Sequence, residues 1–514
     1  MGALLGCAVL ALGCGAKTGV IDPEYDGGPP PEDAGPECHE DVDCDDRTFC
    51  NGEERCIGGH CIDGVRERCT DGDLCTVDRC DVDADACVVE SLRYDRDGDS
   101  HYPIPCGDDC DDEDAQIYPG ALERCNGKDD DCDLLVDEEL LFLPTRVEAR
   151  VTDNDVPDFS QGLAWVEDHW AASHYDQADP SVYLSLLEES GAPMDAAIDL
   201  SVHPGDAYGA GLAWSGRTIG TIWEDRRDGD FEIYFQRLNA QGQKLMADLR
   251  ITFALEFSIN SSIIWTEEEF AIIWQDSRYW TVEPDNDEVF FQRVSEDGEP
   301  LGLEVQVTDS ADPSTDPSVA WSGEEYGVAW VEIVGGDRHS IFFRRLSAEG
   351  ESVSDPMQVA SGAGESTDPA LVWADGEWGM VFEESLGDCA GASTGIPGSC
   401  FMRLSEAGEV VSEQRVDDGS SYARFPSLRW TGSDYILLWS DWRNGQFELY
   451  YAMVDPDGET LIADTRITEA SGDSIGGSMS AGPGDYGILF TDTRDGNYEV
   501  YFTALSCNAE PTVD

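Results

Sequence analysis

Residues 223–242, WEDRRDGDFEIYFQRLNAQG, contain the pattern that decides the fold. An apolar run ends near Trp223, a polar turn follows at Asp228-Gly229, and a second run begins at Glu232. Asp-Gly pairs favour the tight turns that join antiparallel strands, and runs of aromatic and β-branched residues favour strands. The stretch therefore predicts a β-hairpin. Two related stretches are WSDWRNGQFELYYAMVDPDG at 439–458 and FTDTRDGNYEVYFTAL at 490–505.

The hairpin is part of a repeat of about fifty residues. A strand that ends in Trp precedes each hairpin, and a fourth strand ends in Arg-Ile-Thr or a relative of it. The anchor residues are Trp165, Trp214, Trp265, Trp321, Trp373, Trp430 and, in the seventh copy, Ala481, at spacings of 49, 51, 56, 52, 57 and 51 residues. Four strands in each of seven repeats predict an all-β, seven-bladed β-propeller over residues 141–514.

The last repeat stops after its third strand, near Leu505. The missing outer strand is present at the other end of the domain, where residues 145–152 read TRVEARVT. We expect residues 145–152 to complete blade seven and close the ring, which leaves no exposed sheet edge.

The hairpin stretches resemble the TolB-type propeller repeat, closely in three blades and loosely in four. Their shared Asp-x-Arg-[Asp/Asn]-Gly core is expected to be structural, with the Asp and Arg paired beside the turn. A signature that recurs in separate blades is not a single active site. The sialidase sequence Ser-x-Asp-x-Gly-x-Thr-Trp is absent.

An acidic stretch precedes the propeller, from Asp95 to Glu139. It holds 17 acidic residues, few basic ones and four cysteines. Carboxylates at this density repel one another unless cations lie among them. We therefore predict a divalent-cation module over residues 91–140. The alternative is a solvated acidic linker without a defined site.

The opening Asp-x-Asp-Gly-Asp, followed by DCDD at 109–112 and PGALERCNGKDDDCDLLVDE at 119–138, resembles the MopE-type metal-binding motif, with Leu134 where that family usually has Gly. The family takes its name from a copper-binding surface protein. Oxygen donors without clustered His or Met suit Ca²⁺ better than copper, which stays the alternative. The ligands implied are Asp95, Asp97, Asp99, Asp109, Asp111, Asp112, Asn126, Asp129, Asp131, Asp133, Asp137 and Glu138.

The cysteines indicate an oxidising compartment, because 13 of 18 lie between Cys38 and Cys132 and no Cys-x-x-Cys pair occurs. Residues 38–90 resemble small EGF-like cysteine-rich repeats of bacterial surface proteins, and we expect a disulfide-bonded stalk there. In the acidic module, disulfides of Cys106, Cys110, Cys125 and Cys132 would hold the loops in place. Cys389 would pair with Cys400, and Cys507 with the odd cysteine of the N-terminal region.

The N-terminal residues indicate export. Residues 1–13 form a short apolar signal peptide, and Ala11-Leu12-Gly13-Cys14 resembles a bacterial lipobox with Cys14 as the lipidated residue. A plain cleaved signal peptide is the alternative. Residues 15–37, rich in Pro, Gly and acid, would form a disordered linker. We expect a lipoprotein of the outer membrane or cell surface, or else a secreted protein.

Charge limits the partners. Acidic residues outnumber basic ones by 108 to 30, a net charge of −78. Nucleic acid and anionic lipid would be repelled, so membrane contact is expected through the lipid anchor only. A monomer with an unidentified protein or glycan ligand on the propeller is the expected arrangement.

No catalytic residue is assigned from the sequence. Metalloprotease, nucleophile-elbow, Walker and dinucleotide motifs are absent, and His169 and His174 are interpreted as residues of exposed strand ends. The leading hypothesis is a calcium-binding surface protein whose propeller is a binding platform. The alternative is a carbohydrate-active or other hydrolytic propeller enzyme. Carboxylates and aromatic residues at the mouth of the propeller channel would favour the enzyme.

Overall fold

The computed structural model describes most of the chain from residue 38 onward. The described residues are 38–45, 55–62, 69, 73, 75–81, 84, 86–91, 95–104, 106–121, 123, 128–133, 140–145, 147–178, 180–201, 207–280, 286–360, 364–389 and 394–508. The signal peptide, Cys14 and the linker 15–37 lie outside them. Contacts divide the chain into two units within the acidic stretch: residues up to Asp95 with Tyr102–Gly107, and Arg96–His101 with Asp108 onward.

The first unit contains little regular structure and is held by disulfides. Its elements are the 3-10 helix η1 (Asp41–Asp43) and two hairpins, β1 (Arg55–Ile57) with β2 (His60–Ile62) and β3 (Thr76–Asp81) with β4 (Ala86–Ser91). The described residues of this unit form the disulfides Cys38–Cys56, Cys44–Cys61 and Cys69–Cys87. Most described side chains of its strands are exposed. The described part therefore lacks an apolar core large enough to replace the disulfides.

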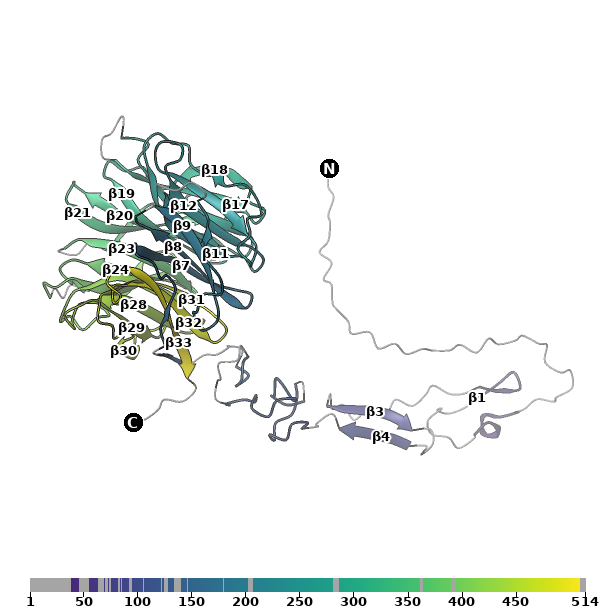
Figure 1. Cartoon of the computed structure of the whole chain (residues 1–514). Coiled ribbons are helices and arrows are strands. Elements are labelled where there is room, and N and C mark those ends of the chain that lie inside the picture. The colour runs from purple at the N-terminus through teal and green to yellow at the C-terminus, as the bar shows by residue number, and fades with distance from the viewer. Residues whose placement is uncertain are drawn as a thin grey trace, which may run out of the picture. The chain divides into compact units, whose positions relative to one another are not determined.

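The second unit contains the seven-bladed propeller, so the predicted fold is confirmed (Figure 1). Each blade is an antiparallel sheet whose first strand is innermost. Blade one is β7 (Asp158–Val166), β8 (His169–Asp176), β9 (Ser181–Leu187) and β10 (Ile198–Asp199); blade two is β11 (Ala207–Trp214), β12 (Ile219–Asp225), β13 (Glu232–Leu238) and β14 (Leu249–Arg250). Blade three is β15 (Ser258–Trp265), β16 (Glu269–Asp276), β17 (Glu288–Ser295) and β18 (Pro300–Gln306); blade four is β19 (Ser314–Trp321), β20 (Glu325–Val334), β21 (Arg338–Ser347) and β22 (Met357–Ala360).

The remaining blades follow the same order. Blade five is β23 (Ser366–Ala374), β24 (Glu377–Glu384), β25 (Gly398–Ser405) and β26 (Val410–Arg415). Blade six is β27 (Ala423–Trp430), β28 (Tyr435–Asp441), β29 (Glu448–Val454) and β30 (Thr460–Arg466). Blade seven is β31 (Ser474–Ala481), β32 (Asp485–Asp492) and β33 (Glu499–Asn508), with β5 (Leu141–Pro144) and β6 (Ala149–Arg150) on its outer edge.

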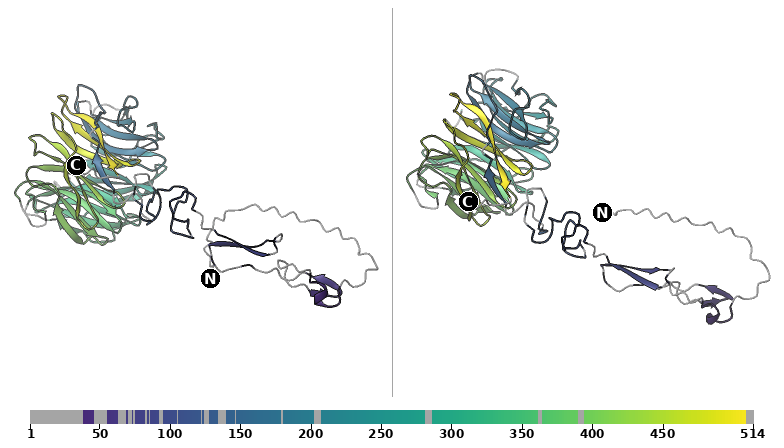
Figure 2. Two further views of the ribbon diagram at one scale, coloured as in Figure 1. Left: turned by 90° about the horizontal axis from the view of Figure 1, so that it is seen from below. Right: turned by 60° about the horizontal axis from the view of Figure 1, so that its bottom comes forward.

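Both ends of the domain meet in blade seven. In β33, Tyr501 pairs with Arg150 and Phe502 with Ala149, while Leu505 pairs with Pro144. The predicted ring closure is confirmed, although the closing strand is split into β5 and β6. Innermost strands β31 and β7 pack together, and Figure 2 shows the yellow strands of blade seven beside the blue strands of blade one.

The Glu of the third strand is bound across the sheet by the Arg and Thr of the Arg-x-Thr motif in the fourth strand. In blade two, Thr252 Oγ1 donates to Glu232 at 2.5 Å and the Arg250 guanidinium pairs with the same carboxylate. In blade seven the partners come from the start of the domain: Thr152 donates to Glu499 at 2.5 Å and Arg150 pairs with it at 2.9 Å. The Arg-x-Thr motif therefore recurs because it satisfies a buried carboxylate.

The Asp and Arg of the turn signature pair, as predicted. Arg227 contacts Asp225 at 2.5 Å, Arg443 contacts Asp441 at 2.6 Å, and Arg494 contacts Asp492 at 2.6 Å. These aspartates are 0–3 % exposed. A charged group this deeply buried requires a partner, which explains the repetition of the pair in separate blades.

Two histidine assignments are corrected by the structure. His169 and His174 are not at exposed strand ends: their side chains are 5 % and 3 % exposed. Both lie on β8, the second strand of its blade, whose side chains pack against blade two on one face and blade seven on the other. In the described part of the chain no helix is long and apolar enough to cross a membrane.

Candidate functional site

The acidic module brings together carboxylates that are ten or more residues apart in sequence. Asp97 and Asp99 present oxygens within 4.8 Å of one another, and the charges of Asp99, Asp97 and Asp112 act on Asp109. Backbone N–H groups shape the loop, since His101 N–H donates to Asp99 Oδ1 at 2.7 Å and Asp111 N–H donates to Asp109 Oδ1 at 2.9 Å. The turns thus direct four carboxylates toward one region.

Two carboxylate oxygens in this cluster are buried without a hydrogen-bond donor among the described residues. They are Oδ2 of Asp99 and Oδ2 of Asp109. Asp109 is 1 % exposed, and its burial, together with the charges of its acidic neighbours, raises its pKa. Burying an unpaired carboxylate oxygen costs several kcal/mol, by order of magnitude, unless a cation or donor compensates it. The arrangement therefore fits a bound cation.

A second acidic group lies in the later half of the module. Glu123, Asp129 and Asp131 present carboxylate oxygens within 4.8 Å of one another. Glu123 Oε1 accepts from Asp130 N–H at 2.8 Å and from Asp131 N–H at 3.0 Å. Glu123 was not among the predicted ligands. Ligands of a metal-binding loop were expected where acidic residues recur at every second position, and Glu123 stands alone between Leu122 and Arg124.

The remaining predicted ligands of the module lie outside these two acidic groups or have other contacts. Asp111 Oδ2 accepts from Lys128 Nζ at 3.0 Å, which lowers the pKa of Asp111. Asp133 N–H donates to Asp129 Oδ1 at 3.1 Å. Asp95 is the last residue of the first unit's main segment. The predicted ligands Asn126, Asp137 and Glu138 lie outside the described residues.

Disulfides are present at several of the predicted cysteines. Cys110 and Cys132 are bonded, with their Cα atoms 5.8 Å apart, and this bond joins the two halves of the module. Cys389 and Cys400 are bonded, with Cα atoms 5.6 Å apart, across the insertion in blade five. Cys507 is also disulfide-bonded. Cys125 lies outside the described residues, so the pairing expected for Cys106 and for Cys507 stays a prediction.

The centre of the propeller holds a cavity of about 430 Å³. It is lined by the innermost strands of blades one, two and three, and by Arg429 and Ser478 from blades six and seven. Glu224 faces it, and burial raises the pKa of Glu224 to about 7 although two backbone N–H groups bind the carboxylate. Burial also lowers the pKa of Arg429, whose Nη1 donates to Leu428 O at 2.9 Å. The cavity is thus polar and carries both charge signs.

Aromatic side chains form a continuous arc across several neighbouring blades of the propeller. Neighbouring ring centroids are 5.0–6.2 Å apart along the series Tyr498, Phe159, Tyr175, Tyr208, Phe231, Phe257 and Trp280. Tyr175 and Tyr208 also line the central cavity. The arc therefore runs from blade seven through blades one and two to blade three.

Polar residues occupy the bulges of the innermost strands in blades three, four and five. Asn260, Asp316 and Asp368 have positive φ angles of 53°, 49° and 52° at bulges of the innermost strands, where Asn and Asp tolerate the left-handed conformation. Asn260 Nδ2 donates to Asp316 Oδ1 at 2.9 Å. Burial raises the pKa of Glu383 to about 7, opposed by Arg424 at 3.1 Å and increased by Asp368.

The acidic module and the propeller each resemble known proteins. The family described as "Putative metal-binding motif", of MopE type, matches residues 109–138. A search of curated proteins finds no match. Among solved structures, the WD40 domain of Toxoplasma gondii coronin is similar with a TM-score of 0.48 and 12 % identity, over 74 % of this chain and 88 % of that one.

Two glycoside hydrolases are also among the similar structures. The α-L-arabinofuranosidase Arb93A from Fusarium graminearum has a TM-score of 0.40 and 10 % identity, over 71 % of this chain and 96 % of that one. The GH43 endo-arabinanase from Bacillus licheniformis has a TM-score of 0.30 and 12 % identity, over 49 % of this chain and 95 % of that one. The chain is thus a propeller that carries a metal-binding motif.

Proposed function

We propose that this chain is an exported surface protein in which Ca²⁺ orders the acidic module and the propeller binds an extracellular ligand. The buried, unpaired Oδ2 atoms of Asp99 and Asp109 carry the metal part of the proposal. The disulfides of both units support an oxidising, extracytoplasmic setting. The lipid anchor at Cys14 would hold the protein at the outer membrane or cell surface.

The donor chemistry favours Ca²⁺ over copper. The clustered side chains that the structure describes are carboxylates, which are hard oxygen ligands. The nearest imidazole, His101, contacts Asp108 at 3.2 Å and stacks on Tyr118 at 5.1 Å, so it is engaged in packing. Modules of this kind bind Ca²⁺ with Kd of about 0.1–1 mM, which extracellular calcium fills.

Calorimetric titration of the purified chain with Ca²⁺ and with Cu²⁺ tests the metal assignment. Asp109→Asn removes the buried charge and is expected to weaken Ca²⁺ binding at least about tenfold. Asp337→Asn, at an exposed propeller position, is the matched control and should bind as the parent does. Stoichiometric copper binding that Asp109→Asn abolishes would show that the ion is wrong, and absent binding of either metal would favour the solvated linker.

The lipid anchor has its own test. Cells expressing the chain are fed an alkyne fatty acid, and the protein is assayed for the label and for retention in the envelope. The parent should be labelled and retained, and Cys14→Ala should be released into the medium. An unlabelled parent found in the medium would establish the secreted alternative.

A glycan-type ligand at the channel mouth is the binding partner that the surface supports best. Aromatic faces pack on sugar rings and carboxylates accept their hydroxyl groups, and Tyr175, Tyr208 and Glu224 all line the central cavity. Tyr208→Ala, in the middle of the arc, should lower retention on a glycan array at least about tenfold. Tyr118→Ala, in the module, serves as a control.

The carbohydrate-active alternative has an observation of its own. Glu224 and Glu383 both have pKa values raised to about 7, as a general acid in glycoside hydrolysis requires. A panel of chromogenic glycosides separates the two functions. Turnover that Glu224→Gln or Glu383→Gln abolishes would show that the propeller is a glycoside-cleaving enzyme. Glycan retention without turnover would support its role as a binding platform.

A further inference from the structure

Blade one departs from the other six blades at a position that they fill with a large aromatic ring. In each blade an acidic residue of the second strand pairs with the first residue of the innermost strand. Two residues before that acid, the other blades have Trp223, Trp274, Trp330, Phe382, Trp439 and Phe490, each 0–1 % exposed. Blade one has His174 at this position, two residues before Asp176. The change replaces an indole or phenyl ring by a smaller, polar ring in a buried place.

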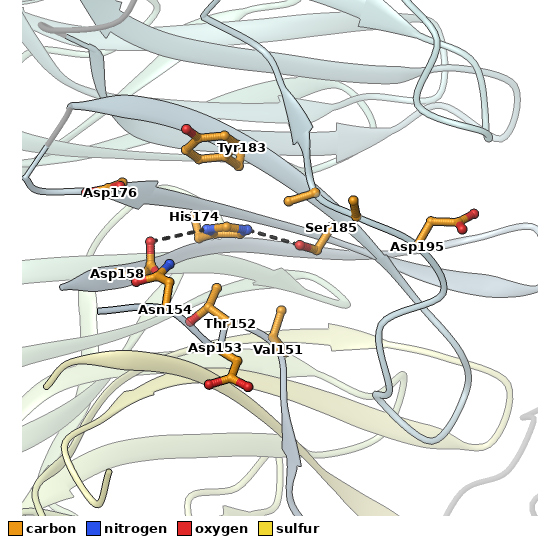
Figure 3. A pocket seen from close by; sticks show the side chains of 12 residues that line it. Val151, Thr152, Asp153, Asn154, Asp158, His174, Asp176, Tyr183, Ser185 and Asp195 are labelled. Carbon is orange, nitrogen blue, oxygen red and sulfur yellow. Dashed lines mark hydrogen bonds and ion pairs between the residues drawn. The ribbon is translucent and has the colours of Figure 1, made fainter. Parts of the chain in front are cut away.

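The layer around this position is also incomplete in blade one. In blade two, the Arg227 guanidinium lies 5.9 Å from the ring of Trp223 and 4.4 Å from that of Tyr234. The equivalent of Arg227 in blade one is Ala178. The smaller side chains leave a cavity of about 360 Å³, seen in Figure 3.

Three polar side chains from three different strands meet in that cavity. His174 Nε2 lies 3.0 Å from Ser185 Oγ, and His174 Nδ1 lies 4.0 Å from Asp158 Oδ1. Figure 3 shows the imidazole between the other two groups. Asn154 Nδ2 donates to Asp158 Oδ2 at 2.5 Å and so fixes the carboxylate. All three side chains are 1–3 % exposed.

Ser185 and Asp158 are departures from the repeat as well. Strand pairing places Ser185 where other blades have Gln236, Ala452 and Thr503. Asp158 stands where other blades have Ala or Ser, as in Ala207, Ser258 and Ala423. Asp158 and His174 are thus specific to blade one, and although blade seven has a hydroxyl at the Ser185 position, in Thr503, no other blade combines the three groups.

Electrostatics set the protonation of the array. Burial lowers the pKa of His174 to about 4, so the imidazole is neutral near pH 7. Burial raises the pKa of Asp158 to about 6, with Asp176 and Glu499 adding to the effect, so Asp158 is mostly ionised near pH 7. In the tautomer with the proton on Nδ1, that N–H lies on the side of the Asp158 carboxylate, 4.0 Å away, and Nε2 accepts from the Ser185 hydroxyl.

We propose that Ser185 is a nucleophile in an acyl-transfer site, with His174 as its general base and Asp158 as the positioning carboxylate. Ser185 Oγ forms a bond to the carbonyl carbon of an ester while its proton passes to His174 Nε2. The bond to the alcohol then breaks, and the alcohol leaves with that proton. Water adds to the acyl-serine, its proton passes through His174 Nε2 to Ser185 Oγ, and the acid is released.

The charge of the cavity wall restricts the substrate. Asp153, Asp176 and Asp195 line it together with Asp158, and the described part of its wall contains no Lys or Arg. An anionic acyl group would be repelled, and a neutral or cationic one accepted. The substrate class is therefore a small neutral or cationic ester. This site is separate from the acidic module and from the channel, so it does not depend on the proposed function.

A fluorophosphonate probe applied to the full-length chain tests the nucleophile, with peptide mass spectrometry to locate the label. The parent should be labelled at Ser185. Ser185→Ala and His174→Phe should each lose at least about tenfold in labelling rate. Both substitutions introduce side chains that other blades hold at these positions, Ala452 and Phe490, so folding should be retained, as checked by the melting temperature.

Ser258→Ala is the matched control, since Ser258 is buried and donates to Asp276 at 3.1 Å but has no histidine partner. It should be labelled at Ser185 as the parent is. Hydrolysis should follow the order acetylthiocholine and p-nitrophenyl acetate above p-nitrophenyl hydrogen succinate. An unlabelled parent, labelling that persists in Ser185→Ala, or a divalent ion that occupies the site and disappears in His174→Phe would each overturn the proposal.

Discussion

The propeller and the acidic module both bury carboxylates, but they neutralise them differently. In the propeller, Arg227, Arg443 and Arg494 each bind a buried aspartate from two residues before them. In the module, Asp99 and Asp109 have buried oxygens that no described donor reaches. The propeller therefore supplies its own cations, whereas the module requires one from solution. This difference predicts opposite responses to mutation and to calcium.

The largest effect is expected from breaking an internal pair of the propeller. Arg443 binds Asp441, which is 0 % exposed, and also contacts Asp418 and Asp464. Arg443→Met should lower the free energy of unfolding by about 3 kcal/mol, because Asp441 keeps its charge without a partner. Thermal or urea unfolding measures it.

Arg217→Met is the control for that experiment. Arg217 pairs with Glu296 at 2.8 Å, but its side chain is 63 % exposed. Its loss should cost less than about 0.5 kcal/mol. Equal losses in the two variants would remove the claim that the propeller's arginines neutralise buried charge.

The module should show the reverse behaviour toward its own buried charge. With a chelator present, Asp109→Asn should be more stable than the parent by about 1 kcal/mol, because it removes an unpaired buried carboxylate. With saturating Ca²⁺, about 100 times Kd, the parent should gain about 2.7 kcal/mol and the variant little. Limited proteolysis of residues 91–140 with and without chelator reports on the module alone.

Protease resistance of the parent can contradict the proposed dependence of the module on a cation. If chelation leaves the protease resistance of residues 91–140 unchanged in the parent, the module does not depend on a cation. Asp337→Asn should behave as the parent in both buffers, since that side chain is exposed.

The channel provides a pH-dependent test. Burial raises the pKa of Glu224 from 4.5 to about 7, so the folded state holds a proton that the unfolded state has lost. The stability from that proton is present below about pH 4.5 and is lost as the pH rises through about 7. Glu224→Gln should therefore flatten the fall of stability between about pH 5 and 7.5, by about 2 kcal/mol. Melting curves across this range measure it, and an unchanged slope would contradict it.

The smallest effect concerns a cation that the module does contain. Lys128 binds Asp111 at 3.0 Å, but its side chain is 48 % exposed. Lys128→Met should change the unfolding free energy by about 0.5 kcal/mol or less. Calcium affinity should rise slightly, by about twofold, because Asp111 is released from its partner. A large loss of calcium binding would show that Lys128 organises the site.

Blade one belongs to the propeller, but among the described residues its buried carboxylate lacks an arginine partner, as Asp99 and Asp109 of the module do. It lacks the Arg of the turn signature and has Asp158 and His174 in the same layer, so its buried carboxylate faces an imidazole in place of a guanidinium. A neutral imidazole can accept a proton, whereas a guanidinium, which stays charged, cannot. The buried Asp158 is thus placed beside a side chain that can act as a base.

The sequence by itself determined the number of blades, the strand order and the ring closure. These follow from local rules, because the alternation of strand residues, the tight turns and the Arg-Ile-Thr strand ends recur at nearly fixed spacing. The acidic stretch likewise predicted a metal module from density of charge alone. Such features depend on neighbours in sequence, which a single chain displays directly.

Only the tertiary structure decided which polar groups are buried together. Asp99 and Asp109 lose access to water through packing of separate loops, and Glu123 joins Asp129 and Asp131 through a turn. Asp158, His174 and Ser185 lie on three strands, and their meeting depends on strand register. Burial and register are long-range properties, so the aligned repeats could mark His174 as unusual but could not show what it contacts.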